Sequence, residues 1–230
     1  MSSIAIITAR GGSKRIPKKN IKEFMGKPMI AYAIDAALNS KIFDTVMVST
    51  DDREISNLAL QYGAEVPFLR SQETANDFAS TFDVLKEVIF EYQKRGERFD
   101  TIGCIYPCVP FLSKEILCRA YKVFITSDCE SLTPVVKFSY PIQRAFRING
   151  DGYLEYREPE NASKRSQDLE PMYHDVGMFY FMKNSIFEGG RNRSKYFEMD
   201  ERCIQDIDTY DDWQMAELKF KMISHMPNVF

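Results

Sequence analysis

A glycine turn crowded with cations follows the first apolar run of the chain, residues 4–7. The turn extends from Ala9 through Gly11 and Gly12 to Asn20, and its positive side chains are Arg10, Lys14, Arg15, Lys18 and Lys19. Glycine adopts backbone conformations closed to other residues and lets main-chain N–H groups approach an anion, while lysine and arginine add charge-assisted contacts. These residue types in this order are suited to holding phosphate groups.

The positive charge of this turn is local. Residues 10–27 hold seven Lys or Arg and one acid, a net charge of +6, so the remainder carries −9 in a chain of formal charge −3. The alternative is a solvated basic turn, but a turn directly after a strand lies where open α/β sheets bind ligands. It contains neither Gly-x-x-x-x-Gly-Lys-Ser/Thr nor Gly-x-Gly-x-x-Gly, which argues against a P-loop kinase and an ordinary dehydrogenase.

Paired carboxylates near the other end of the chain are the second feature that could do chemistry. In an extended segment side chains alternate between faces, so Asp206 and Asp208 project to one side while Ile207 points to the core. Two carboxylates on one face can hold a divalent cation. The alternative interpretation is that Asp208 or Thr209 caps the last helix, with further acids following at its positive end.

Cations that bind phosphates, together with paired carboxylates that place Mg²⁺ among them, are typical of phosphoryl or nucleotidyl transfer. Other candidates are weaker. Asp51 and Asp52 follow a strand and could face a ligand, although Asp52 is better interpreted as a helix cap. Arg70 could contact a base or a phosphate, or it could be a surface arginine. His174, beside Asp175 and after a polar run, is the histidine best placed for a role.

Short apolar runs alternate with amphipathic stretches along the first part of the chain. Strands are expected at residues 4–8, 45–49, 66–69, 101–106 and 131–136. Helices are expected at residues 29–38, 55–62, 81–92 and 114–125. This alternation predicts an α/β fold, a Rossmann-like, mostly parallel sheet with helices on both faces.

The alternation breaks at residues 138–175. Residues 146–148 and 153–156 alternate around an Asn-Gly turn, which predicts a hairpin within a long loop. Residues 177–182 return to strand character. A final helix follows, with an apolar stripe formed by Trp213, Ala216, Phe220 and Ile223. We expect one domain, residues 1–230, that carries residues 138–175 as a small β-rich insertion.

Composition excludes several classes of protein. With 230 residues, 44% of them hydrophobic, the chain can bury one substantial core. A pI near 5.6 gives no broad basic face for nucleic acid. No stretch approaches the roughly 18 apolar residues of a membrane span and no signal-peptide pattern is present, so we expect a cytoplasmic protein that does not engage a membrane. The 5 cysteines lack Cys-x-x-Cys spacing and are expected to be reduced thiols.

Four motifs together resemble the CMP-sialic acid synthetase family of cytidylyltransferases, and they occur in order over nearly the whole chain. They are residues 9–14 with Lys19 and Asn20, residues 26–30 (Gly-Lys-Pro-Met-Ile), residues 49–52 (Ser-Thr-Asp-Asp) and residues 206–209 (Asp-Ile-Asp-Thr). The resemblance implies a fold of the nucleotide-diphospho-sugar transferase type. It also implies that a sugar hydroxyl attacks the α-phosphorus of CTP, giving a CMP-sugar and pyrophosphate, a reaction that needs positioning and charge neutralisation more than covalent catalysis.

Three segments narrow the resemblance to one group within the family. Residues 141–145 and 165–169, followed by residues 173–175, are most similar to members of the family that use pseudaminic acid, a sugar of flagellin glycosylation. His174 stands where enzymes for sialic acid would carry arginine. Tyr106 begins Tyr-Pro-Cys-Val-Pro, where the family commonly has Gln-Pro-Thr-Ser-Pro, so a glutamine contact to the base is not implied.

The resemblance also implies roles for particular residues. Arg10 and Lys19 would neutralise the triphosphate, and Asp206 and Asp208 would hold Mg²⁺. The implied nucleotide contacts are Ala9, Arg10, Gly11, Gly12, Lys14, Lys19, Asn20, Arg70, Ser80 and Thr81. The implied sugar contacts are Gln143, Arg165, Gln167, His174 and Asp175. The insertion would pack against a second subunit of a homodimer and help to build the sugar site of that subunit.

Two alternatives remain open from the sequence. One is a cytidylyltransferase for another acidic sugar, N-acetylneuraminic, legionaminic or KDO-like. The other is a nucleotide-sugar-binding protein without turnover, because one fold hosts many functions. The presence of both the cations and the paired aspartates counts against the second alternative, since a binding module would not need them together.

Overall fold

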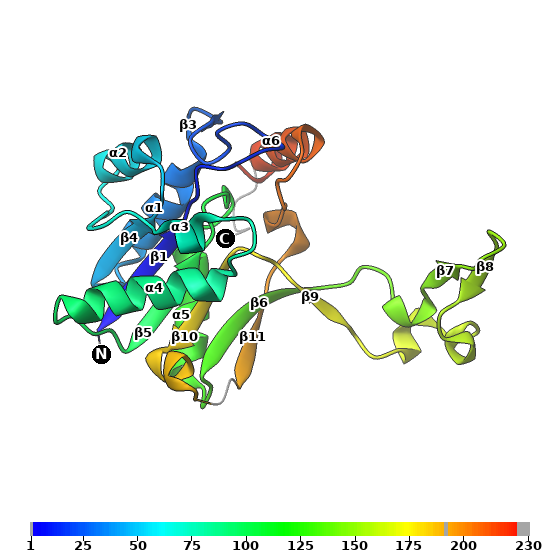
Figure 1. Ribbon diagram of the computed structural model, residues 1–230. Coiled ribbons are helices and arrows are strands. Elements are labelled where there is room, and N and C mark those ends of the chain that lie inside the picture. The colour runs from blue at the N-terminus through cyan, green and yellow to red at the C-terminus, as the bar shows by residue number, and fades with distance from the viewer. Residues whose placement is uncertain (1, 191–192, 225–230) are drawn as a thin grey trace.

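The protein consists of a seven-stranded sheet with helices on both faces and an arm that projects to one side (Figure 1). The computed structural model describes residues 2–190 and 193–224. The strands of the sheet are β1 (Ser3–Thr8), β4 (Thr45–Ser49), β5 (Thr101–Ile105), β6 (Ser131–Lys137), β9 (Tyr173–Asp175), β10 (Phe179–Lys183) and β11 (Ser194–Glu198). The helices are α1 (Met29–Ser40), α2 (Arg53–Gln61), α3 (Gln72–Ala75), α4 (Thr81–Lys94), α5 (Lys114–Thr126) and α6 (Tyr210–Ser224).

The sheet is mostly parallel, as expected. Its order is β11-β6-β10-β5-β1-β4, with β9 paired to β6. Strand β1 runs parallel to β4 and β5, and β11 runs parallel to β6, whereas β10 is antiparallel to both of its neighbours. The carboxyl ends of β1, β4 and β5 therefore meet at one edge, which is where ligands bind to sheets of this kind.

Alternating side chains of β1 belong to two cores. Ala5 and Ile7 face the core built with α1, α5 and α6, while Ile4 and Ile6 face the core built with α4. Strands covered on both faces are apolar on both faces, which explains the uninterrupted hydrophobic run of β1. The apolar stripe expected on the last helix is part of the first core, where Trp213 packs edge-on against Phe24.

Side chains directly before two of the helices cap them. Asp52 accepts hydrogen bonds from the backbone N–H groups of Glu54 and Ile55 at the start of α2, which confirms the capping interpretation. Ser80 and Asp83 form a reciprocal capping box at the start of α4. Such caps satisfy N–H groups that have no partner inside the helix.

The arm, residues 138–172, leaves the sheet between β6 and β9. Its base is an antiparallel ribbon in which Val135 lies opposite Asp175. Farther out, β7 (Phe146–Ile148) and β8 (Leu154–Tyr156) form the hairpin that the Asn-Gly turn predicts. The remaining short elements of the arm are the 3-10 turns η1 (Ile142–Arg144), η2 (Pro159–Asn161) and η3 (Ser166–Asp168).

Other elements differ from the expectation or were not expected. Residues 66–69 form no strand, and a single bridge joins Met47 to Glu65. Pro67 lacks the N–H group that a longer ladder would use, which explains this wrong prediction. The elements without a sequence prediction include β11, α3, the small hairpin of β2 (Glu23–Phe24) and β3 (Lys27–Pro28), and the 3-10 turns η4 (Asn184–Glu188) and η5 (Glu201–Cys203). All five cysteines are free, as expected. No helix within the described residues is long and apolar enough to cross a membrane.

Candidate active site

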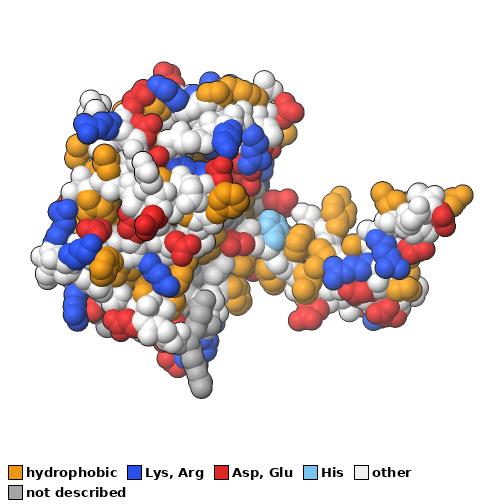
Figure 2. Space-filling view, in the orientation of Figure 1, with side chains coloured by type: hydrophobic (Ala, Val, Ile, Leu, Met, Phe, Trp, Pro, Cys, Tyr) orange, Lys and Arg blue, Asp and Glu red, His pale blue; other side chains and the backbone are white. Residues whose placement is uncertain are grey.

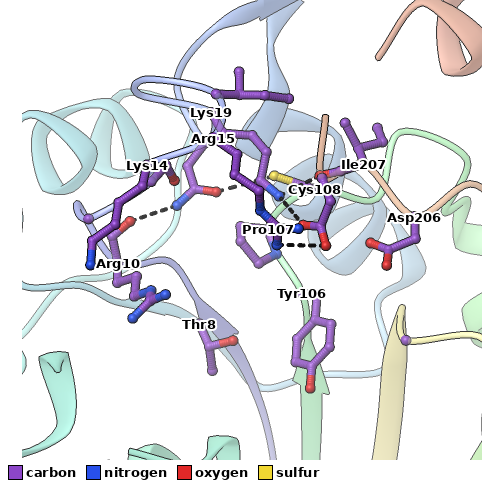
Figure 3. Close-up of a pocket in the computed structure, with 16 residues that line it drawn as sticks. Thr8, Arg10, Lys14, Arg15, Lys19, Tyr106, Pro107, Cys108, Asp206 and Ile207 are labelled. Carbon is purple, nitrogen blue, oxygen red and sulfur yellow. Dashed lines mark hydrogen bonds and ion pairs between the residues drawn. The ribbon is translucent and has the colours of Figure 1, made fainter. Parts of the chain in front are cut away.

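A cavity of about 470 Å³ opens at the carboxyl edge of the sheet, between the loop after β1 and the segment before α6 (Figure 3). The lining residues are Thr8, Arg10, Gly12, Ser13, Lys14, Arg15, Ile16, Lys19, Asn20, Tyr106, Pro107, Cys108, Gly177, Asp206, Ile207 and Asp208. The basic turn and the paired aspartates, almost two hundred residues apart in sequence, thus face one space. The structure brings together the two features that the sequence singled out.

The basic turn is held in place by hydrogen bonds behind the cavity. The N–H group of Gly11 donates to Asp51 at 3.0 Å. A Cβ atom at Gly11 would lie 2.8 Å from Oδ2 of Asp52, so a larger residue would displace the side chain that caps α2. The side chain of Asn20 donates to the carbonyl of Arg10 at 2.9 Å and accepts from the Cys108 thiol at 3.2 Å. Burial raises the pKa of Cys108 to about 12, so this thiol stays protonated and remains a donor.

Four cations of the turn pair with two acids. Arg10 and Lys14 contact Asp77 at 2.7 and 2.6 Å. Arg15 and Lys19 contact Asp208 at 2.7 and 3.3 Å. Hydrogen bonds from Lys14, and then from Arg10, hold the pKa of Asp77 below its ordinary value.

Lys18, the fifth cation of the turn, has a different partner. It pairs with Glu54 on α2 at 2.5 Å and is not among the residues that line the cavity. The sequence could not separate it from Lys19, whose ammonium donates to the carbonyl of Ile207 at 2.5 Å.

The paired aspartates have the alternation that the sequence predicts. Ile207 is buried, while Asp206 and Asp208 reach the cavity. The cap of α6 is formed by Thr209, whose hydroxyl accepts from the N–H group of Asp212 at 3.2 Å, and the Asp212 carboxylate accepts in return from the N–H group of Thr209 at 2.8 Å. The capping alternative therefore holds for Thr209, and the Asp208 carboxylate is left for the cavity.

The two carboxylates of this segment are the kind of donor that a magnesium ion takes. Among the described residues no group of three or more His, Cys, Asp or Glu is arranged to hold a metal. Magnesium is usually bound by one or two carboxylates, with substrate phosphates and water completing its shell. Asp206 and Asp208, beside a cationic cavity, fit that pattern.

A second hollow of about 260 Å³ adjoins the cavity and shares Thr8, Arg10 and Tyr106 with it. Arg70 lines this hollow and is only 8% exposed, so it is not a surface arginine. It donates to the carbonyl of Ser49 at 2.6 Å, and burial lowers its pKa from the ordinary value. Thr81 also lines the hollow and shares a 3.1 Å hydrogen bond with the hydroxyl of Tyr106.

Three predicted nucleotide contacts, Ala9, Gly11 and Ser80, line neither the main cavity nor the second hollow. Ala9 is fully buried. The N–H group of Gly11 is used by Asp51, and the Ser80 hydroxyl is used in the cap of α4.

A third hollow, of about 480 Å³, lies at the base of the arm and shares Tyr106, Gly177 and Asp206 with the main cavity. His174 and Asp175 line it, as expected for sugar contacts. The Asp175 carboxylate accepts from the Tyr180 hydroxyl at 2.8 Å and from the N–H group of Gly177 at 2.8 Å.

The other three predicted sugar contacts, Gln143, Arg165 and Gln167, belong to the arm and do not line any of these three hollows. Gln143 donates to the carbonyl of Glu170 at 2.8 Å, and both Arg165 and Gln167 are exposed. Within one chain, the structure does not bring them to His174 and Asp175.

Sequence reasoning gave no site role to Tyr106, Asp77 or Lys219. Tyr106 lines all three hollows, and its position directly after β5 was a signal that could have found it. Asp77 lies in an irregular segment and Lys219 in a helix whose pattern shows only an apolar stripe. Nothing local marks either of them.

Comparison with known proteins defines the class. A cytidylyltransferase family model matches residues 4–139. The chain belongs to this family, and it is a nucleotidyltransferase. Solved structures share its fold, among them a CMP:2-keto-3-deoxy-manno-octonic acid synthetase complexed with CTP, with a TM-score of 0.70 and 18% identity over 98% of this chain and 100% of the other. A 4-diphosphocytidyl-2C-methyl-D-erythritol synthase of Anaerococcus prevotii has a TM-score of 0.67 and 12% identity, over 96% of each chain.

Particular relatives match nearly the full length. A pseudaminic acid cytidylyltransferase of Campylobacter jejuni is 41% identical, over 96% of this chain and 97% of its own. A CMP-N,N'-diacetyllegionaminic acid synthase of Legionella pneumophila is 33% identical, over 94% and 95%. A post-translational flagellin modification protein B of Campylobacter coli is 30% identical, over 95% and 94%. The resemblance expected from the motifs is confirmed.

Proposed function

We propose that the protein transfers CMP from CTP to the anomeric hydroxyl of an acidic nine-carbon sugar, and that this sugar is pseudaminic acid. The observation that carries the proposal is the 41% identity, over nearly both full lengths, to an enzyme of that name. The hydroxyl oxygen forms a bond to the α-phosphorus. The bond between the α-phosphorus and the oxygen that bridges it to the β-phosphate breaks, and pyrophosphate leaves with that oxygen. The proton of the hydroxyl passes to solvent.

The three adjoining hollows suit the three parts of this reaction. The cationic cavity would take the triphosphate, with Arg10, Lys14 and Lys19 as its counterions and Asn20 orienting the turn. The hollow with Arg70 and Thr81 would take the nucleoside, and the hollow with His174 and Asp175 the sugar. Tyr106, which borders all three, would lie where the sugar hydroxyl meets the α-phosphate.

Asp206 and Asp208 would hold Mg²⁺. The chemistry that the ion supplies when bound is neutralisation of charge on the phosphate oxygens. Arg15 and Lys19 contact Asp208. The two cations and the carboxylate therefore face the same part of the cavity. Charge-assisted contacts of the cations to the triphosphate would then orient the α-phosphorus for in-line attack.

We further propose a homodimer in which the arm of one subunit reaches the sugar hollow of the other. The arm exposes large apolar side chains, including Tyr140 at 83%, Ile148 at 74% and Leu154 at 66% (Figure 2). Apolar side chains gathered in this way are typical of a surface that another protein covers. Gln143, Arg165 and Gln167 would then serve the site of the partner subunit.

We also propose that the enzyme acts in the cytoplasm, where CTP is available, and that its product serves flagellin glycosylation. The relative named as a flagellin modification protein supports this assignment.

The test is pyrophosphate release by purified protein with Mg²⁺. CTP is compared with ATP, GTP and UTP, and pseudaminic acid with N-acetylneuraminic, legionaminic and KDO-type acids. We expect turnover with CTP and the highest kcat/KM with pseudaminic acid. A higher kcat/KM with N-acetylneuraminic acid would contradict the choice of sugar. Binding of CTP without pyrophosphate release from any sugar would favour the binding protein.

A further inference from the structure

Lys219 lies on the inner side of α6 and reaches the sugar hollow. It follows Ala216 by three residues and precedes Ile223 by four, both of which are buried, and it lines the hollow together with Ile204. Its ammonium donates to the carbonyl of Ile204 at 2.7 Å. A lysine ammonium has three donors, so this bond leaves two for other partners.

The hollow has one permanent positive charge. Of its twelve lining residues, all of them described, Lys219 is the only Lys or Arg, while Asp175, Glu201 and Asp206 are acids. Two of these acids already have partners within the protein: Asp175 accepts from Tyr180 and Gly177, and Glu201 accepts from Ser139 at 3.0 Å. Asp206 faces the main cavity as well.

Lys219 has no ion-pair partner among residues 2–190 and 193–224. A half-buried ammonium that lines a hollow and has no carboxylate partner can make a charge-assisted contact with an anionic ligand. The ligand of this hollow would be an acidic sugar, whose carboxylate is such an anion.

We propose that Lys219 binds the carboxylate of the acidic sugar and so selects acidic sugars over neutral ones. The inference rests on the proposed function for the identity of the ligand. A charge-assisted N–H···O contact between the ammonium and the carboxylate would recognise the sugar, while the carbonyl of Ile204 holds the lysine in place.

The structural alternative is that Lys219 only ties α6 to the segment that carries the paired aspartates. Lys219→Met keeps the aliphatic stem and removes the charge, Lys219→Arg keeps the charge, and Lys221→Met is the matched control on the exposed side of the same helix. Binding of pseudaminic acid and of its carboxamide is measured by calorimetry with a non-hydrolysable CTP analogue present, so that turnover is not required.

We expect Lys219→Met to weaken binding of the acid by roughly 10- to 100-fold, the usual effect of losing a hydrogen bond to a charged group. Binding of the carboxamide and of the CTP analogue should change less than twofold, and Lys219→Arg should recover most of the affinity for the acid. Lys221→Met should match the unmodified protein.

If Lys219→Met loses affinity equally for the acid and the carboxamide and also has a lower thermal midpoint, Lys219 only holds α6 to the segment before it. That result would overturn the inference. Failure of the unmodified protein to bind the acid at all would overturn it too. Pyrophosphate release by the unmodified protein is scored separately: turnover together with unchanged binding in Lys219→Met rejects the role of Lys219 and leaves the proposed function standing.

Discussion

At the scale of single residues, the backbone path decides which cations of the basic turn reach the cavity. Lys18 and Lys19 are neighbours in sequence, yet Lys18 pairs with Glu54 on α2 while Lys19 reaches Ile207 and Asp208 at the cavity. A positive φ of 54° at Lys18 turns the chain between them, in a conformation that few residues other than glycine adopt. The same composition with another backbone path would not present Lys19 to a phosphate.

We therefore expect Arg10→Ala and Lys19→Ala each to lower kcat/KM with CTP by roughly 10²- to 10³-fold, the usual effect of removing one preorganised charge contact to the transition state. Lys18→Ala should retain activity within a few-fold. Initial rates of pyrophosphate release measure the loss of activity, and thermal midpoints show whether the variants remain folded. Near-normal rates in both site variants would mean that the turn is a surface feature.

The paired aspartates allow a test of metal binding that leaves the helix cap intact. Asp206→Asn and Asp208→Asn each remove one charge at nearly constant size, and the cap of α6 survives because Thr209 and Asp212 form it. Activity should fall strongly at limiting Mg²⁺ and recover in part at high Mg²⁺, with little change in thermal midpoint. Asp211→Asn, in the exposed first turn of α6, is the control. Normal turnover of the two variants at limiting Mg²⁺ would remove these aspartates from the site.

At the scale of elements, the segment between α3 and α4 pairs with cations that the proposed function assigns to the triphosphate. Its Asp77 pairs with Arg10 and Lys14, the same side chains that would hold the triphosphate. All three side chains are well exposed, and exposed ion pairs are weak. A triphosphate can therefore displace Asp77 at small cost.

We expect Asp77→Asn to lower KM for CTP severalfold with kcat nearly unchanged, and the difference to shrink at high salt. Because its neighbours lower the pKa of Asp77 from 3.8, the carboxylate is ionised above that range and the pair is lost only as the pH falls below it. The ratio of KM values should therefore be constant between pH 6 and 9. Glu91→Gln, which breaks an exposed pair with Lys94 on α4, is the control. A higher KM in Asp77→Asn would mean that Asp77 positions the cations.

At the scale of the whole molecule, the proposed homodimer makes the arm of one chain part of the sugar site of the other. Gln143, Arg165 and Gln167 stand outside the hollows of their own chain, so a shared site predicts complementation between defective subunits. At limiting Mg²⁺, Arg165→Ala and Asp208→Asn chains should each be nearly inactive alone. Refolded together in equal amounts, they should recover about a quarter of normal activity, because half of the dimers are mixed and each mixed dimer has one intact site.

The oligomeric state gives an independent measurement of the same prediction. Ile148→Asp combined with Leu154→Asp places charge on the exposed apolar hairpin and should yield monomers in light scattering. Leu60→Asp, at an exposed position of α2, is the control and should leave the dimer intact. If the mixed Arg165→Ala and Asp208→Asn chains form dimers but recover no activity, the prediction of a shared site is wrong and each site is built by one chain.

Much of the fold was predictable because its signals are local. The apolar run of β1 and the amphipathic periods of α4 and α5 each lie within about fifteen residues, and hydrophobic period predicts such elements well. Strand β11, with mostly exposed side chains, has no such period. The prediction of a strand at residues 66–69 was wrong because an apolar run can lie beside a sheet without forming its hydrogen bonds.

The sequence by itself determined the basic turn, the same-side spacing of Asp206 and Asp208, and the hairpin of the arm, since each depends on residues a few positions apart. Only the tertiary structure decided that Asp77 and Asp208 share the cations, that Tyr106 borders three hollows, and that Lys219 is the sole permanent cation lining one of them. These facts depend on the order β11-β6-β10-β5-β1-β4, which brings together segments almost two hundred residues apart. No local pattern encodes which strand ends become neighbours, because that choice is made by the packing of the whole sheet.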